Sequence, residues 1–261
     1  MPNFVYVHID NISNAVLTQE ISAADFHNGI IHQPRNLLLL DPTNDMGEFE
    51  AHTAMKIIRG SEAVEKYFQS AERKNIRSNK WIDFTDTLML KELSAIEISE
   101  LLYFGHMKTH LHSPFFYKLQ NNFAYFNLQD GLTRTYYRYL DEFYHVLSQK
   151  ITHIVLEKLN SKRSFFQKPK SIKAVPADII KKLSDMMKEG LVFSFDQTEF
   201  KNKKYEIPLY LVEDTRIRKG HIVLQDDALI GDLIYYSNKN TWELKVNFDE
   251  LELWSLPNSS L

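Results

Sequence analysis

The sequence contains no cysteine and little glycine, and both shortages exclude whole classes of chemistry. Without cysteine the chain has no disulfides, no thiol nucleophile and no thiolate ligand for zinc or an iron–sulfur cluster. Its 8 glycines stand apart from one another, whereas a loop that cradles a phosphate needs clustered glycines. Neither a dinucleotide-binding motif nor a P-loop is present, so we do not expect that nucleotide chemistry.

Long apolar runs are also missing. No window reaches the roughly 18 consecutive apolar residues that a membrane-spanning helix needs. Residues 1–10 have no basic segment ahead of their apolar residues and no small-residue cleavage site, so they predict a strand and not a signal peptide. We therefore expect a soluble, cytoplasmic protein without a membrane partner, and the lack of cysteine fits a reducing compartment.

What is present is an ordinary globular composition, with 44% hydrophobic and 25% charged residues. The 31 Lys+Arg nearly balance the 34 Asp+Glu, for a formal net charge of -3. Such a balance argues against a protein whose main task is nonspecific binding of polyanions. Contact with nucleic acid would therefore require a local basic patch.

Residues that favour strands gather near both ends of the chain. The N-terminal part predicts strands at 4–9, 36–40 and 49–58, and its polar residues 72–80 predict a loop. After Gly190, strands are predicted at 191–195, 205–212, 220–224, 229–236 and 242–248. With helices between these regions, the order predicts an α+β fold that ends in an antiparallel sheet or small barrel.

Helical signals fill the middle of the chain. Ser61 is a candidate N-cap of a first helix, and Ser94 with Glu97 has the spacing of a capping box that starts a second. This second helix is expected to end near Gly105, because glycine adopts the left-handed conformation of a helix C-terminus easily. Apolar residues at helical spacing over 140–159 predict a long amphipathic helix.

The polar and basic stretch 161–175, which contains Pro169, interrupts this helical periodicity. We expect it to be a linker between two domains. The first is an α+β domain at 1–160, and the second, at 176–261, is a helix followed by an antiparallel sheet.

An aromatic β-hairpin is predicted at 122–138, because Asp130-Gly131 between two β-prone runs is typical of a two-residue turn. That turn pairs Phe123 with Arg138, Tyr125 with Tyr136 and Asn127 with Arg134, on one face. Burying two guanidinium groups without partners is costly, so we expect this face to be partly exposed. The candidate ligand-binding residues are Phe123, Tyr125, Arg134, Tyr136 and Arg138. Such residues can stack on bases and pair with phosphates, or the arginines can simply lie along their neighbours.

A second basic feature is a run of cations without acids that begins at Lys158. Its further members are Lys162, Arg163, Lys168, Lys170 and Lys173. Such a run suits a patch that follows a phosphate backbone, and it equally suits a solvated linker.

The densest histidine cluster is His106, His110 and His112. If the helix continued past Gly105, the first two would share a face at a spacing suited to zinc or another divalent metal. No Asp or Glu lies between Glu100 and Asp130, so a carboxylate ligand would come from elsewhere in the fold, for instance Asp141, Glu142 or the paired Asp226-Asp227. Histidines without a metal are the alternative.

Two functions follow from these features. We expect a non-enzymatic binding or regulatory protein without a cofactor, whose ligand meets the surface around the hairpin. A protein, a nucleic acid and a small anion all remain open as that ligand. The alternative is a metal-dependent hydrolase organised by the three histidines, with no catalytic residue identified.

Overall fold

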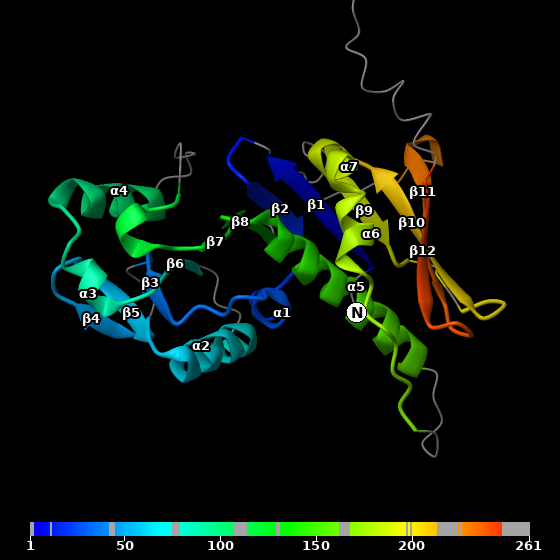
Figure 1. Cartoon of the computed structure of the whole chain (residues 1–261), viewed down its shortest axis with the longest axis horizontal. Coiled ribbons are helices and arrows are strands. Elements are labelled where there is room, and N and C mark those ends of the chain that lie inside the picture. The colour runs from blue at the N-terminus through cyan, green and yellow to red at the C-terminus, as the bar shows by residue number, and fades with distance from the viewer. Residues whose placement is uncertain are drawn as a thin grey trace, which may run out of the picture. The chain divides into compact units, whose positions relative to one another are not determined.

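The computed structural model shows an α+β chain that divides into two compact units (Figure 1). Unit 1 is Met1–His8 with Ser148–Leu261, and unit 2 is Ile9–Leu147. The boundaries fall inside strand β1, Phe4–Asp10, and helix α5, Leu140–Ser161. Only the backbone is described for residues 71–74, 106 and 226. The structure describes residues 3–10, 12–41, 45–74, 79–106, 114–128, 131–161, 168–196, 198, 200–212, 224 and 226–246.

Unit 2 is built on an antiparallel sheet. Its described strands, in sheet order, are β2 Ala15–Gln19, β8 Leu132–Tyr137, β7 Phe123–Asn127, β6 Lys80–Phe84, β3 Asn36–Leu39, β5 Met55–Arg59 and β4 Glu48–Glu50. Its helices are α1 Ala23–Gly29, α2 Ser61–Lys74, α3 Thr87–Leu90, α4 Ala95–His106, the 3-10 turn η1 Tyr117–Leu119 and the beginning of α5.

Helices cover both faces of the central strands of this sheet. On one face, Ile82 and Phe126 pack in a cluster with Phe104 of α4. On the other face, Trp81 and Tyr125 stack with ring centroids 5.1 Å apart, and phenylalanines of α1 and α2 contact the tryptophan. Successive side chains of a strand point to opposite faces, so these central strands bury nearly every residue.

Unit 1 contains a second antiparallel arrangement. Its described strands, in sheet order, are β12 Thr241–Val246, β11 Leu229–Tyr236, β10 Lys204–Leu211, β9 Leu191–Ser194 and β1. Its helices are the remainder of α5, α6 Ala177–Lys181, α7 Ser184–Glu189 and the 3-10 turn η3 Asp226–Ala228. In the described part β12 does not pair with β1, so the sheet is open and is not a small barrel. The strand predicted at 220–224 lies outside the described residues except for Leu224, which is not in a strand.

The capping box at the start of α4 is confirmed. The Ser94 amide donates to Oε2 of Glu97 at 2.7 Å, and the Glu97 amide donates to Oγ of Ser94 at 3.3 Å. We expect Ser94→Ala to lower the free energy of unfolding by about 1 kcal/mol, because the helix loses this cap. Denaturant unfolding measures the change, with Ser99→Ala, the same substitution inside α4, as the control. Equal losses in the two variants would contradict a capping role.

Several details of the N-terminal part differ from the sequence prediction. The strand predicted at 49–58 is a hairpin of β4 and β5, and β2 was not predicted. Strand β6 begins at Lys80, the last residue of the predicted loop. Helix α4 continues one residue past Gly105, which is not in the left-handed region. A Cβ on Gly105 would lie 2.6 Å from the carbonyl oxygen of Leu40, so close packing is what requires a glycine there.

The linker predicted at 161–175, and with it the division into 1–160 and 176–261, stays a prediction. Residues 162–167 lie outside the described part, and residues 168–175 form neither helix nor strand. The two compact units divide at different positions in the sequence, within β1 and α5.

Candidate functional site

The aromatic hairpin forms, but its register differs by one residue from the predicted register. The Leu128 amide donates to the carbonyl oxygen of Leu132 at 2.8 Å, so three residues separate this pair in the sequence, where the prediction placed two residues between Gln129 and Leu132. As a result, Phe126 and not Asn127 pairs with Arg134. The predicted pairs are therefore wrong, since a shift of one residue exchanges the faces of one strand relative to the other.

This shift divides the predicted binding face. Phe123 and Tyr125 lie on one face of the hairpin, while Arg134, Tyr136 and Arg138 lie on the other. The three aromatic side chains are buried, with 0%, 2% and 2% exposure, and both arginines are half-buried. The expectation of an exposed aromatic face is wrong, because both faces of β7 and β8 contribute to cores of unit 2. Their burial removes the physical reason for expecting a ligand there.

Arg138 belongs to a polar network with the carboxylate of Asp83. Oδ1 of Asp83 accepts hydrogen bonds from the amides of Phe123, at 2.6 Å, and Asn122, at 3.0 Å. Arg138 donates from Nε to the carbonyl oxygen of Asn121 at 2.7 Å. Burial raises the pKa of Asp83 to about 7, although the two amides and the positive charge of Arg138 oppose the rise. The network ties β6 to the two ends of the hairpin, which is a structural task.

The predicted metal ligands fall mostly outside the described residues. Helix α4 ends at His106, of which the backbone alone is described, and His110 and His112 are not described. Among the described residues, no group of three or more His, Asp or Glu side chains could hold a metal ion. Glu142 instead pairs with Nδ1 of His32. A zinc or other divalent metal site therefore stays a prediction.

The basic segment is described from residue 168 onwards, and its three lysines there are exposed. Lys162 and Arg163 lie outside the described residues. The Lys173 amide donates to Oδ1 of Asn240 at 2.8 Å, and Nε1 of Trp242 donates to the Lys173 carbonyl oxygen at 2.8 Å. The Lys170 amide donates to Oδ1 of Asn160, at the end of α5, at 2.9 Å. These bonds fix the backbone of the segment and leave its ammonium groups in solvent.

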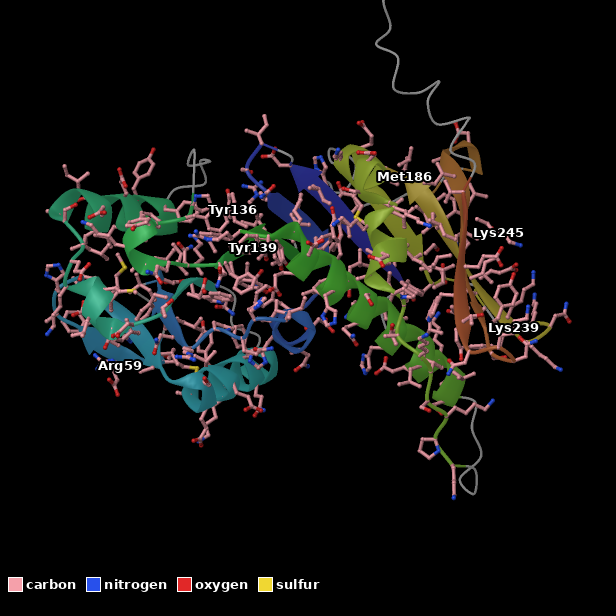
Figure 2. The ribbon with its side chains drawn as sticks, in the orientation of Figure 1. Arg59, Tyr136, Tyr139, Met186, Lys239 and Lys245 are labelled. Atoms are coloured by element: carbon pink, nitrogen blue, oxygen red, sulfur yellow. The ribbon has the colours of Figure 1, made fainter. Side chains whose placement is uncertain are left out.

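The segment adjoins two turns that also carry lysines. Residues 237–240 join β11 to β12, and Figure 2 shows Lys239 at this end of the strand pair. The Ser237 amide donates to the carbonyl oxygen of Lys203 at 2.8 Å, in the turn that precedes β10. The exposed lysines of these three neighbouring segments form what we call the cationic surface: Lys168, Lys170, Lys173, Lys201, Lys203 and Lys239.

The cationic surface carries uncompensated charge. In the part of the chain that the structure describes, none of its six lysines forms an ion pair, whereas the adjacent Lys204 binds Glu206 at 2.5 Å. The aromatic rings below it are not available to a ligand, because Tyr235 is 2% exposed and Trp242 is 8% exposed. Their centroids lie 5.0 Å apart, so they form a packed support for the turns. The arrangement can attract phosphates, and these two rings are not exposed for base stacking.

Sequence reasoning found three members of this surface and missed Lys201, Lys203 and Lys239. The missed lysines lie in short polar turns that are distant from residues 168–173 in sequence. The signal that could have found them is the pairing of β10 with β11, since it places the beginning of one strand beside the end of the other.

No family model, no curated protein and no solved structure matches the chain. Among the described residues, no helix is both long and apolar enough to cross a membrane.

Proposed function

We propose that this protein is a non-enzymatic binding protein that holds the phosphate backbone of a nucleic acid on the cationic surface. The observation that carries the proposal is the gathering of six exposed lysines, without a paired acid, from three segments of unit 1. Lysine acts as a compact point charge toward phosphate. Releasing the counterions condensed on a nucleic acid then supplies binding free energy.

The distribution of these lysines favours a polymer over a small anion. A site for one small anion needs donors that converge on a single point, usually in a concave pocket. Here the charges stand on separate turns, each exposed to solvent. A chain of phosphates can contact several of them at once. Among the described residues, the surface contains no arginine, whose planar fork reads a guanine edge. The proposed contact is therefore insensitive to sequence.

The net charges of the two units support a contact with nucleic acid that is limited to unit 1. Unit 1 has 18 Lys+Arg and 16 Asp+Glu, whereas unit 2 has 13 and 18. The negative charge of the whole chain thus belongs to unit 2. We expect moderate affinity, because the negative charge of unit 2 repels the ligand. We also expect the affinity to fall steeply with salt, because binding releases counterions from the phosphates.

The test is the triple variant Lys168→Gln, Lys170→Gln and Lys173→Gln, measured against a fluorescein-labelled oligothymidine strand by anisotropy. We expect an affinity loss of about tenfold or more at low salt. The slope of log K against log salt concentration should become shallower by about 2, because three phosphate contacts are removed from a single strand.

A matched control removes the same charge elsewhere. Lys66→Gln, Lys91→Gln and Lys182→Gln change three exposed lysines outside the cationic surface. Their combined variant should keep the affinity and the salt slope of the wild type. Equal losses in both triple variants, or no binding by the wild type at low salt, would remove the proposal.

A further inference from the structure

Helix α4 of unit 2 is apolar on the side that faces the core and also on the side that faces solvent. Leu101 and Phe104 point into the core, with 0% and 3% exposure. Ile96 and Tyr103 lie on the outer side, with 72% and 47% exposure. Large apolar side chains exposed together on one side of a helix mark a candidate contact surface.

The outer side of α4 carries a shallow, open depression of about 430 Å³, which we call the groove. Its lining residues are Ala95, Ile96, Ser99, Glu100 and Tyr103. Ile96, Ser99, Glu100 and Tyr103 follow the helical spacing i, i+3, i+4 and i+7, and Ala95 flanks Ile96, so the five form one continuous stripe. Ser99 is a small residue between the larger side chains of Ile96 and Tyr103, so another helix can approach closely there.

One negative charge stands in this apolar stripe. Glu100 forms no ion pair within the described part of the chain. Its neighbour Glu97 is already bound to Nζ of Lys118 at 2.8 Å. A partner that covers the groove must therefore bring a positive charge to Glu100, because leaving that carboxylate desolvated and unpaired is costly.

We propose that this groove binds a basic amphipathic helix of a partner protein. Apolar residues of the partner at helical spacing would cover Ile96 and Tyr103, and a lysine or arginine on its edge would meet Glu100. This surface lies in unit 2, and it is independent of the cationic surface of unit 1.

A small molecule, a second copy of the chain and a lipid surface each fit the groove less well than a basic helix does. All of its lining residues come from one helix, so it does not enclose a small molecule. Two antiparallel copies of α4 that cross at Ser99 would place one Glu100 close to the other, with like charges opposed. Anionic lipid headgroups would be repelled by the same carboxylate.

The test uses the full chain and two labelled peptides. The first is a helical peptide with leucine on one face and lysine on the other, and the second has every lysine replaced by glutamate. We expect the wild type to bind the lysine peptide, and Ile96→Ser to weaken that binding by about tenfold. Glu100→Lys should weaken binding of the lysine peptide and create binding of the glutamate peptide. This exchange of preference is a readout that misfolding cannot produce.

Matched controls are Leu88→Ser and Glu92→Lys, which change an exposed apolar residue and an exposed acid outside the groove. They should leave binding of both peptides unchanged. Equal effects of control and groove variants, or no exchange of preference in Glu100→Lys, would overturn the proposal.

Two further measurements test the other occupants. Sedimentation of the wild type over a concentration series tests self-association, and a dimer that Ile96→Ser dissociates would replace the partner helix with a second copy. Binding to anionic vesicles that Ile96→Ser abolishes would replace it with a lipid surface.

Discussion

Replacing Gly231 with alanine should lower the free energy of unfolding by about 3 kcal/mol or more. Gly231 lies inside β11 with φ 148°, a conformation that side chains rarely adopt. A Cβ there would lie 2.1 Å from the carbonyl oxygen of Lys245 and 2.9 Å from Cα of Val246. Both contacts are with the backbone of β12, so relief requires the two strands to separate.

The control for Gly231→Ala is Gly131→Ala in the hairpin of unit 2. Gly131 also has positive φ, at 73°, but nothing lies within 4 Å of the position of its Cβ. Alanine there should cost about 1–2 kcal/mol, from backbone conformation alone. Denaturant unfolding followed by circular dichroism measures both variants. Equal losses would show that the contact with β12 is relieved without cost.

The buried carboxylate of Asp83 should make the protein less stable as pH rises from about 4 to about 7. Burial raises the pKa of this group from 3.8 to about 7, so in this range the folded state holds a proton that the unfolded chain has released. The contribution of Asp83 to stability is therefore greatest below its unfolded pKa, and it is lost as pH rises through the folded pKa. The total change is about 4 kcal/mol. Asp83→Asn, which stays neutral, should remove this dependence.

Glu97→Gln is the control of opposite sign. The hydrogen bond from Lys118 lowers the pKa of Glu97 from 4.5 to about 2. Its contribution to stability is present above pH 4.5 and is lost as pH falls toward 2, so this variant should change only the acid limb. Urea unfolding at a series of pH values compares the two. Stability that rises between pH 4 and 7 in the wild type, and not in Asp83→Asn, would mean that the amides of Asn122 and Phe123 keep the carboxylate ionised.

Local signals in the sequence predicted local structure well. The spacing of Ser94 and Glu97 identified the start of α4, and the apolar periodicity over 140–159 identified α5. Both depend on residues within a few positions of one another. Strand β6 was missed because its five residues follow a polar stretch and include the buried Asp83. Only the core of unit 2, formed by distant segments, makes that strand favourable.

The register of the hairpin and the members of the cationic surface were harder to predict. Each depends on contacts that the residues themselves do not determine. Asp130-Gly131 predicts a hairpin turn, but this pair is compatible with connections of two and of three residues. The length of the connection decides whether Arg134 and Tyr136 lie on the same face as Phe123 and Tyr125 or on the opposite face. The cationic surface depends on hydrogen bonds such as that from the Lys173 amide to Asn240, which join segments far apart in sequence.

The pairing of Phe4 in β1 with Ser194 in β9 has a consequence for the order of synthesis. The ribosome adds roughly 5–20 residues per second, so the first strand emerges roughly 10–40 s before the strand that it pairs with in unit 1. Val5 and Val7, which are both 0% exposed in the finished fold, are without that partner throughout this interval. A nascent chain of this protein therefore exposes the apolar residues of β1 without this partner strand until Ser194 has been made, whereas residues 9–147 have all emerged well before then.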